Sequence, residues 1–292
     1  MSRSEAVRLT TDKREIHAFL QRDPVYAAYA IGDLEPEMFA DCTWYLAGHG
    51  DAARALVLVY RGLAPTVLLT MGDPEAAADV LAAIPLPDRA YMVAQCEHLP
   101  VFEKFYDFSV DRVRPMIRMT VAPDAFRPAR TAAKDHELRR LGSADVPAIE
   151  ALYSHGGPHA PDAFHPRQVR DGVFFGVGAP ESDQLLAIAG THLIAPNWGV
   201  GAVGNIYTHP AWRGRGLATL LTGAVTADLL QRGLLVVLNV DQANAAAIHI
   251  YESLGYRTHC PYVEGIGRVV SFPRRRESTP GRPGFPLLQR ET

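Results

Sequence analysis

The C-terminal half of the sequence contains short apolar runs followed by amphipathic segments. The runs at 173–177, 185–194 and 200–208 are rich in β-branched residues and are bounded by Gly, Pro, Asp or Asn, which predicts strands. Three such runs in succession are expected to form an antiparallel meander. From Gly216 onward apolar residues follow helical spacing, and the run at 235–240 predicts a buried strand. The pattern therefore predicts a strand, helix, strand unit after the meander.

Helix-capping signals extend this layout on both sides. Ser143 precedes apolar positions within 146–153, which predicts a capped amphipathic helix. Asn244 is placed to cap a last helix over 245–254, and a further strand is expected to begin near Tyr256. Mixed helices and strands of this kind predict an α/β (α+β) fold.

Composition shifts divide the chain into four parts. Residues 126–136 lie in a stretch that loses apolar periodicity and carries prolines, which predicts a linker between domains at 1–125 and 137–268. Residues 271–292 contain four prolines and five arginines and no repeating apolar face, so we expect a disordered tail.

The N-terminal half repeats the layout of the C-terminal half more loosely. The segment at 100–119, PVFEKFYDFSVDRVRPMIRM, is similar to the segment at 247–266, AIHIYESLGYRTHCPYVEGI. The two segments occupy corresponding positions near the ends of the two halves. We therefore expect two domains of the same fold in tandem.

Composition excludes several classes of partner. Hydrophobic residues make up 48% of the chain and charged residues 21%, as in ordinary globular proteins. The formal net charge of −3 provides no basic excess for nucleic acid or an anionic membrane. No apolar run approaches the ~18 residues of a membrane span, so a cytoplasmic protein is expected. Three cysteines lack CxxC spacing, which predicts no disulfide framework and no thiolate metal site.

The stretch at 205–221, NIYTHPAWRGRGLATLL, carries the most informative chemistry. A strand leads into a loop of glycines and arginines that opens a helix. Helix starts present unpaired amides and partial positive charge, and glycines allow close approach, so a phosphate group fits there. A surface turn with solvated arginines is the alternative. A dinucleotide fingerprint would need a third glycine where Thr219 stands, and the Gly-Lys-Ser/Thr of a P-loop is absent.

Two linked motifs give this stretch a specific resemblance. Arg213-x-x-Gly216-x-Ala218 is similar to the pyrophosphate-binding motif of the GNAT superfamily of N-acyltransferases. The second part of that signature follows as Asn244-x-x-Ala247-x-x-x-Tyr251-x-x-x-Gly255-Tyr256. The resemblance covers about residues 136–265 and is faint in the N-terminal half. It implies a GNAT fold, with a mixed, mostly antiparallel central sheet flanked by helices.

The resemblance implies a binding mode for acetyl-CoA as co-substrate. Two central strands should splay to admit the thioester, and backbone groups on one of them should bind the pantetheine arm. The residues expected at the pantetheine are Ile206, Tyr207, Thr208 and Asn244, the last of which is equally explained as a plain helix cap. The residues whose amides should hold the pyrophosphate are Arg213, Gly214, Arg215, Gly216, Leu217, Ala218 and Thr219.

The resemblance also implies catalytic roles. Tyr251 would protonate the departing thiolate, although a core tyrosine on the apolar helix face is the alternative. An amine of pKa near 10.4 is free base in only about one of a few thousand molecules at pH 7, so its proton must be removed. The strand before the loop lacks the glutamate that is common in the family. His192 is the nearest candidate base, Asn205 could instead hold a relaying water, and His192 could also be structural.

Two further stretches bear on function. The loop at 155–165 holds three histidines, but its Pro and Gly content suits a border of the acceptor pocket better than a metal site, so no metal is expected. In the N-terminal half, Asp73 and Glu75 stand where a phosphate loop would fall, after the strand at 66–70. Carboxylates at a helix start repel a pyrophosphate, so this half is expected to bind no acyl-CoA.

The expected function is transfer of an acetyl group from acetyl-CoA to a primary amine of a small molecule or amino acid. Acetylation of a protein lysine or N-terminus is an alternative within the same enzyme class. A catalytically inactive CoA-binding sensor is an alternative of another class, favoured by the missing glutamate.

Overall fold

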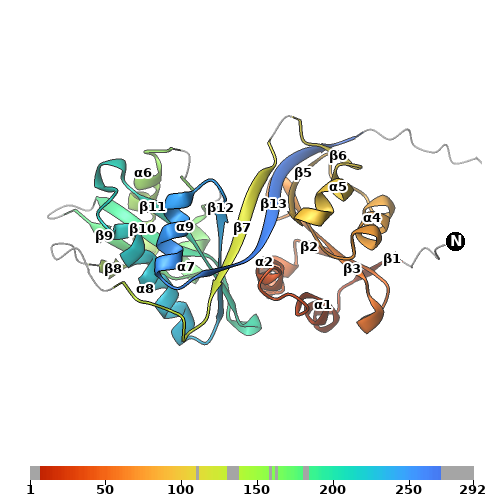
Figure 1. Ribbon diagram of the computed structural model, residues 1–292, viewed down its shortest axis with the longest axis horizontal. Coiled ribbons are helices and arrows are strands. Elements are labelled where there is room, and N and C mark those ends of the chain that lie inside the picture. The colour runs from red at the N-terminus through yellow and green to blue at the C-terminus, as the bar shows by residue number, and fades with distance from the viewer. Residues whose placement is uncertain are drawn as a thin grey trace, which may run out of the picture.

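A computed structural model describes residues 7–109, 112–129, 138–157, 160–161, 164–179 and 184–270. In these ranges thirteen strands form one sheet, in the order β1-β2-β3-β4-β5-β13-β7-β12-β11-β10-β9-β8, with β6 paired to β13. Figure 1 shows two lobes joined by the long strands β7 and β13. Residues 130–136 of the expected linker at 126–136, and the whole expected tail at 271–292, lie outside the described residues.

The N-terminal half contributes seven strands and five helices to the described structure. Its strands are β1 (Val7–Thr10), β2 (Cys42–Ala47), β3 (Ala55–Tyr60), β4 (Thr66–Gly72), β5 (Arg89–Gln95), β6 (Tyr106–Asp107) and β7 (Arg114–Val121). Its helices are α1 (Lys13–Leu20), α2 (Ala28–Gly32), α3 (Pro36–Phe39), α4 (Pro74–Ala83) and α5 (Leu99–Phe102).

The C-terminal half follows the same order of elements in its described residues, without counterparts of α3 and β6. Its strands are β8 (Leu138–Arg140), β9 (Phe174–Gly178), β10 (Leu185–Ala195), β11 (Val200–Thr208), β12 (Leu235–Asp241) and β13 (Arg257–Val269). Its helices are α6 (Val146–Tyr153), α7 (Pro166–Asp171), α8 (Leu217–Gln231) and α9 (Ala245–Ser253). In each half one neighbouring pair is parallel, β4 with β5 and β11 with β12, and the other described pairs are antiparallel. The expected mixed, mostly antiparallel sheet flanked by helices is confirmed.

The elements expected in the C-terminal half are present with small shifts at their ends. The run at 200–208 is strand β11 without change, and Asn244 caps α9 by accepting the amide of Ala247 at 3.2 Å. The expected cap at Ser143 is wrong. Ser143 begins a short 3₁₀ turn, and Asp145 instead accepts the amide of Gly142 at 2.8 Å, so the α-helix begins only at Val146.

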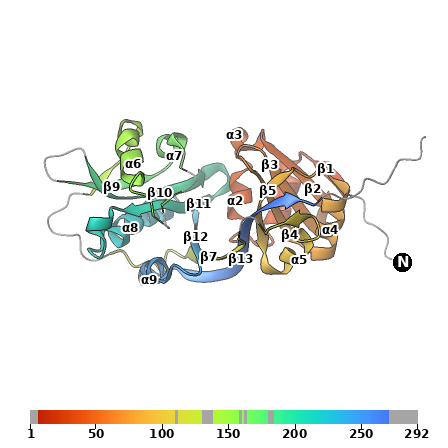
Figure 2. The same ribbon diagram turned by 90° about the horizontal axis from the view of Figure 1, so that it is seen from above.

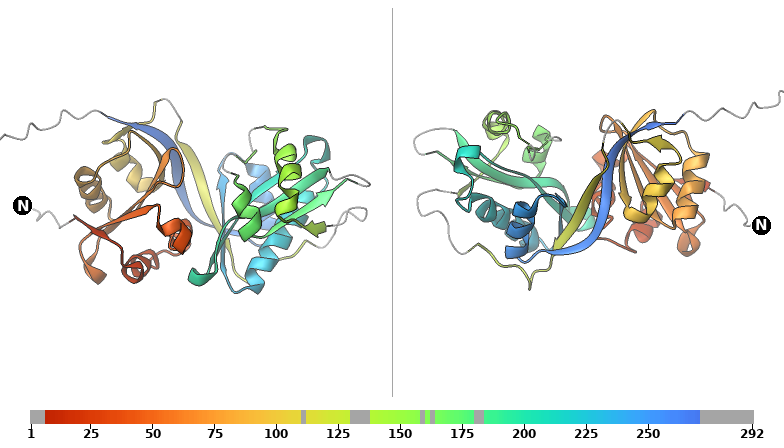
Figure 3. Two further views of the ribbon diagram at one scale, coloured as in Figure 1. Left: turned by 180° about the vertical axis from the view of Figure 1, so that it is seen from behind. Right: turned by 45° about the horizontal axis from the view of Figure 1, so that its top comes forward.

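The last strand of each half pairs with the other half. β7 lies against β12, from Val236 opposite Val121 to Asp241 opposite Met116. β13 pairs with β7 over residues 257–264 and with β5 over residues 262–268, which makes one continuous sheet of the two halves. Figure 3 shows the two strands crossing side by side between the lobes. These strands contain the ends of the two similar segments found in the sequence.

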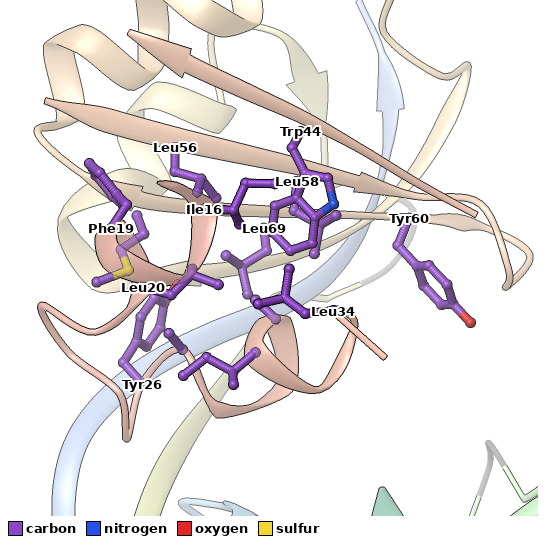
Figure 4. Packing of buried hydrophobic residues seen from close by; sticks show 14 of the residues in the cluster. Ile16, Phe19, Leu20, Tyr26, Leu34, Trp44, Leu56, Leu58, Tyr60 and Leu69 are labelled. Atoms are coloured by element: carbon purple, nitrogen blue, oxygen red, sulfur yellow. The ribbon is translucent and has the colours of Figure 1, made fainter. Parts of the chain in front are cut away.

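Helices α1 and α2 of the N-terminal half pack against one face of its sheet. A buried cluster joins α1 and the start of α2 to β2, β3 and β4, with Trp44, Leu56 and Leu58 on the strands facing Ile16 and Leu20 (Figure 4). Burial of each such side chain stabilises the fold by about 1.5–3 kcal/mol. The cluster therefore holds α2 firmly against the sheet.

Helix α2 also contacts the C-terminal half, and Figure 2 shows it at the junction of the lobes. Ala28 packs on Ala202 and Val237, and a Cβ at Gly32 would lie 2.8 Å from Leu193. Polar contacts continue the junction: Glu35 accepts the Asn197 side-chain amide at 2.8 Å. Among the described residues, no helix is long and apolar enough to cross a membrane.

Candidate active site

The loop between β11 and α8 has a backbone shape that requires glycine. Gly214 and Gly216 both have φ of +76°, a left-handed conformation that costs other L-residues roughly 1–2 kcal/mol. A Cβ at either position would meet no atom within 4 Å, so the space above the loop is open. Arg213 and Arg215 are exposed on the same loop. The glycines are thus explained by backbone conformation.

The start of α8 has amides without partners. Gly216 is the N-cap and offers no side-chain acceptor. The first intrahelical bond runs from Leu220 to the Gly216 carbonyl, at 3.0 Å, and no described residue accepts the amides of residues 214–219. Amides of this kind, with the partial positive charge of a 15-residue helix, attract an anion. The loop has the geometry of a phosphate site.

Strands β11 and β12 separate beside this loop. Their parallel register ends at Val203 opposite Leu238, so residues 204–208 have one edge that β12 does not pair. His209 donates its amide to the Leu186 carbonyl on the β10 side, and backbone groups alternate along a strand. The backbone groups of Ile206 and Thr208 therefore face the open edge. Arg213 Nε donates to the Thr208 carbonyl there, at 3.3 Å.

Tyr207 is oriented differently from its neighbours. It lies opposite Ile188 in the β10–β11 pair, which directs its backbone groups toward β10. Its hydroxyl donates to the Gly156 carbonyl at 2.7 Å, and its ring is buried. The expected pantetheine contact of Tyr207 stays a prediction, and its backbone lies on the less suitable edge of β11.

Tyr251 lies on α9 and packs in the buried cluster that α8 and α9 form with β11 and β12. Its side chain is buried, and its ring lies 6.1 Å from that of Tyr256. Burial raises the pKa of Tyr251 well above its ordinary value, and the phenol of Tyr29 raises this pKa further. Tyr251 keeps its proton at neutral pH.

His192 lies on β10 and is half-buried. Its ring centroid is 5.3 Å from that of Tyr29, and its carbonyl accepts the side-chain amide of Gln168 at 2.8 Å. Asn205 stands nearby with φ of +52°, next to the register shifts of the β10–β11 pair. Its amide donates to the Thr191 carbonyl at 3.0 Å, which leaves its oxygen available for a water. The structure thus places His192 and Asn205 close together on the neighbouring strands β10 and β11, where both bond to Gln168.

Sequence reasoning missed three residues at this place. Gln168, at the start of α7, fixes both His192 and Asn205. Tyr29 and the buried Arg118 come from the N-terminal half, on α2 and β7. No motif marks them, because their position depends on the packing of one half against the other.

The corresponding place in the N-terminal half is filled by the chain's own side chains. Asp73 caps α4 by accepting the Ala76 amide at 2.8 Å, and it forms an ion pair with Arg54. The β4–β5 register ends at Leu69 opposite Val93, and beyond it His98 contacts the Gly72 carbonyl at 2.9 Å. In the N-terminal half, Asp73 thus occupies the start of the helix and His98 occupies the edge of the strand. The corresponding helix start and strand edge beside α8 are open.

The histidine-rich loop is only partly described. His155 packs its ring against that of His209, with centroids 4.2 Å apart, and His165 caps α7 by accepting the Arg167 amide. His159 lies outside the described residues. The described part of the chain has no group of three His, Cys, Asp or Glu placed to bind a metal ion.

Residues 138–256 match the family described as "Acetyltransferase (GNAT) family". This segment is a GNAT acetyltransferase domain. The match includes β11, the glycine loop, α8, β12 and α9, which are the elements that form the open helix start and the separated strands. The resemblance read from the two motifs is confirmed.

Curated relatives carry a more specific name. The chain is 30% identical over 166 residues to a mycothiol acetyltransferase of Renibacterium salmoninarum, covering 51% of this chain and 49% of that protein. It is 37% identical over 100 residues to a mycothiol acetyltransferase of Tsukamurella paurometabola, covering 34% of each. The matches thus span about half or less of the length of these relatives.

Solved structures share the fold over most of the chain. A Drosophila protein has a TM-score of 0.71 at 14% identity, covering 91% of this chain and 99% of its own. A tandem GNAT protein from the clavulanic acid biosynthesis pathway has a TM-score of 0.56 at 12% identity, covering 90% and 98%. These likenesses support a tandem GNAT architecture and say nothing of the acceptor.

Proposed function

We propose that the protein transfers an acetyl group from acetyl-CoA to a primary amine of a small molecule. The observation that supports this proposal most strongly is the group of unpaired backbone amides at the start of α8. These amides lie directly beside strands β11 and β12, which separate after Val203 and Leu238. A GNAT domain uses this combination to hold a long anionic thioester. The expected co-substrate is therefore acetyl-CoA.

The chain offers complementary groups along the length of this co-substrate. Amides of residues 214–219, together with the guanidinium groups of Arg213 and Arg215, would hold the pyrophosphate. The open-edge backbone groups of Ile206 and Thr208 would bond the pantetheine as a further strand would. Asn244 caps α9 near the end of β12, and its second role at the pantetheine is part of the proposal.

The acetyl group is transferred when the amine nitrogen attacks the thioester carbonyl and the carbon–sulfur bond breaks. The amide of Thr208 on the open edge is the proposed donor to the oxyanion. Tyr251 is the proposed donor to the departing sulfur. Its raised pKa makes complete transfer of the proton to a thiolate of pKa near 8.5 unfavourable, so its contribution is a hydrogen bond that strengthens as charge develops.

The amine must lose a proton before or during attack. His192 is the proposed base, since an unperturbed imidazole titrates near neutrality. A water held by the Asn205 oxygen is the alternative route. His192→Ala should flatten the acidic limb of the kcat/KM pH profile, and an unchanged limb would favour the water.

A thiol-release assay tests the function. Acetyl-CoA is supplied with a panel of small amines, amino acids, lysine peptides and N-terminal peptides, and free CoA is followed with a thiol reagent. Release with small amines at a higher kcat/KM than with peptides supports the proposal. Faster release with peptides would favour protein acetylation. Binding without any release would indicate a CoA sensor.

The N-terminal half is proposed to bind no acyl-CoA. Asp73, Arg54 and His98 satisfy the groups that a co-substrate would use. Calorimetric titration of the whole chain with acetyl-CoA should give one site per chain. A stoichiometry near two would overturn this part of the proposal.

A further inference from the structure

Helix α2 of the N-terminal half directs a tyrosine at the opening in the C-terminal half. Tyr29 is half-buried, and its ring lies 5.3 Å from that of His192 on β10. Its phenol also raises the pKa of Tyr251, which packs in the cluster formed by α8 and α9 with β11 and β12. Tyr29 is thus in ring contact with His192, the proposed base, and acts electrostatically on Tyr251, the proposed donor to the sulfur.

The ring of Tyr29 is held from its other side by a buried cation. The Arg118 guanidinium carbon lies 4.6 Å from the Tyr29 ring centroid and 5.1 Å from that of Tyr262. Arg118 is fully buried, and its Nε and Nη1 have no hydrogen-bond partner in the described structure. A buried guanidinium whose nitrogens lack hydrogen-bond partners is stabilised chiefly by cation–π contact with the faces of the aromatic rings around it. It therefore fixes the plane of the Tyr29 ring.

The hydroxyl of Tyr29 is not used by the fold. No described residue forms a hydrogen bond with it, whereas Tyr26, three residues earlier, donates to the Thr70 carbonyl at 3.0 Å. Thr70 lies on β4 beyond the end of its pairing with β5, in the closed site of the N-terminal half. Tyr26 thus faces the separated strands of the N-terminal half, whose polar groups are already bonded. Tyr29 faces the corresponding strands of the C-terminal half, where its hydroxyl has no bonded partner among the described residues.

We propose that Tyr29 is a positioning residue for the acceptor, supplied to the catalytic half by the N-terminal half. Its hydroxyl oxygen accepts a hydrogen bond from the acceptor amine and presents the nitrogen lone pair to the thioester, between His192 and Tyr251. The inference rests on the proposed function. It gives the N-terminal half, which is proposed to bind no acyl-CoA itself, a direct part in binding the acceptor.

Burial raises the pKa of Tyr29 to about 12, although the charge of Arg118 acts in the opposite direction. The phenol is therefore neutral at pH 7. A neutral hydroxyl accepts from an uncharged amine without forming an ion pair, so it favours the nucleophilic form of the acceptor. The cation beneath the ring keeps a bound ammonium less favourable at the same place.

The test compares Tyr29→Phe with Tyr26→Phe in the whole protein. Phenylalanine keeps the ring between His192 and Arg118, so Tyr29→Phe should fold with an unchanged melting temperature. We expect its acceptor KM to rise about fivefold to tenfold, with the acetyl-CoA Kd unchanged. Tyr26→Phe should leave the acceptor KM unchanged and lower the melting temperature, because it removes a buried hydrogen bond. Unchanged acceptor KM in Tyr29→Phe would overturn the proposal.

A second measurement does not depend on turnover. In protein labelled with 3-fluorotyrosine, the resonance missing from Tyr29→Phe identifies Tyr29. The resonance of Tyr45, a partly buried residue on β2, is identified in the same way from Tyr45→Phe and serves as the reference. Acetyl-CoA should shift the Tyr29 resonance and leave that of Tyr45 in place. A shift without thiol release for any amine would refute the acetyltransferase function while placing Tyr29 at the site. An unmoved Tyr29 resonance would refute the placement.

Discussion

The glycine that begins α8 provides a direct test of the co-substrate site. Gly216→Asp puts a carboxylate where Asp73 stands in the N-terminal half. A carboxylate about 4 Å from one unit of phosphate charge costs roughly 4 kcal/mol at an effective dielectric of about 20. At about 1.4 kcal/mol for each factor of ten, acetyl-CoA should bind roughly a thousandfold more weakly.

Thermal unfolding measures this loss. With acetyl-CoA at about 100 times its Kd, the wild-type protein should gain about 2.7 kcal/mol, which corresponds to roughly 5–10 °C in Tm. For Gly216→Asp the same concentration is about one tenth of the new Kd, and the gain falls below about 0.1 kcal/mol. The shift in Tm should therefore disappear.

Gly199→Asp is the matched control. Gly199 has φ of +72° and open space at its Cβ, as Gly216 does, but it lies in the turn between β10 and β11. Both variants carry the same backbone strain and the same added charge. Only Gly216→Asp should lose the acetyl-CoA shift. Equal shifts in the two variants would show that the pyrophosphate does not bind at the start of α8.

Three further predictions concern single side chains. Tyr251→Phe should lower kcat at least tenfold with little change in the acetyl-CoA Kd, measured by thiol release and calorimetry, and full activity would assign Tyr251 to packing alone. Asn244→Ala removes the acceptor of the Ala247 amide and should lower the free energy of unfolding by about 1 kcal/mol in urea; no loss would mean that the cap contributes nothing. Burial raises the pKa of Asp33 to about 7, so the native state holds a proton that the unfolded state releases near pH 4, and stability falls as pH rises between these values. Asp33→Asn should therefore stabilise the protein more at pH 8 than at pH 5 in urea unfolding, and equal effects at both values would contradict the assignment.

The local sequence determined the elements and the anion-binding loop. Strand β11 and the glycine loop could be read directly, because β-branched runs, helical spacing and positive-φ glycines act within a few residues. The cap at Asn244 and the closed helix start at Asp73 could be read for the same reason. Ser143 was misjudged because a competing local contact, from Gly142 to Asp145, was available.

Tertiary structure alone decided how the halves are joined and which residues complete the site. The pairing of β7 with β12 and of β13 with β5 depends on long-range register, for which a strand carries no signal about its partner. Tyr29 and Arg118 look like ordinary residues of a helix and a strand in the sequence. Tyr29 reaches His192, and Arg118 reaches Tyr29, only because strands β7 and β13 and the packing of α2 hold the two halves together.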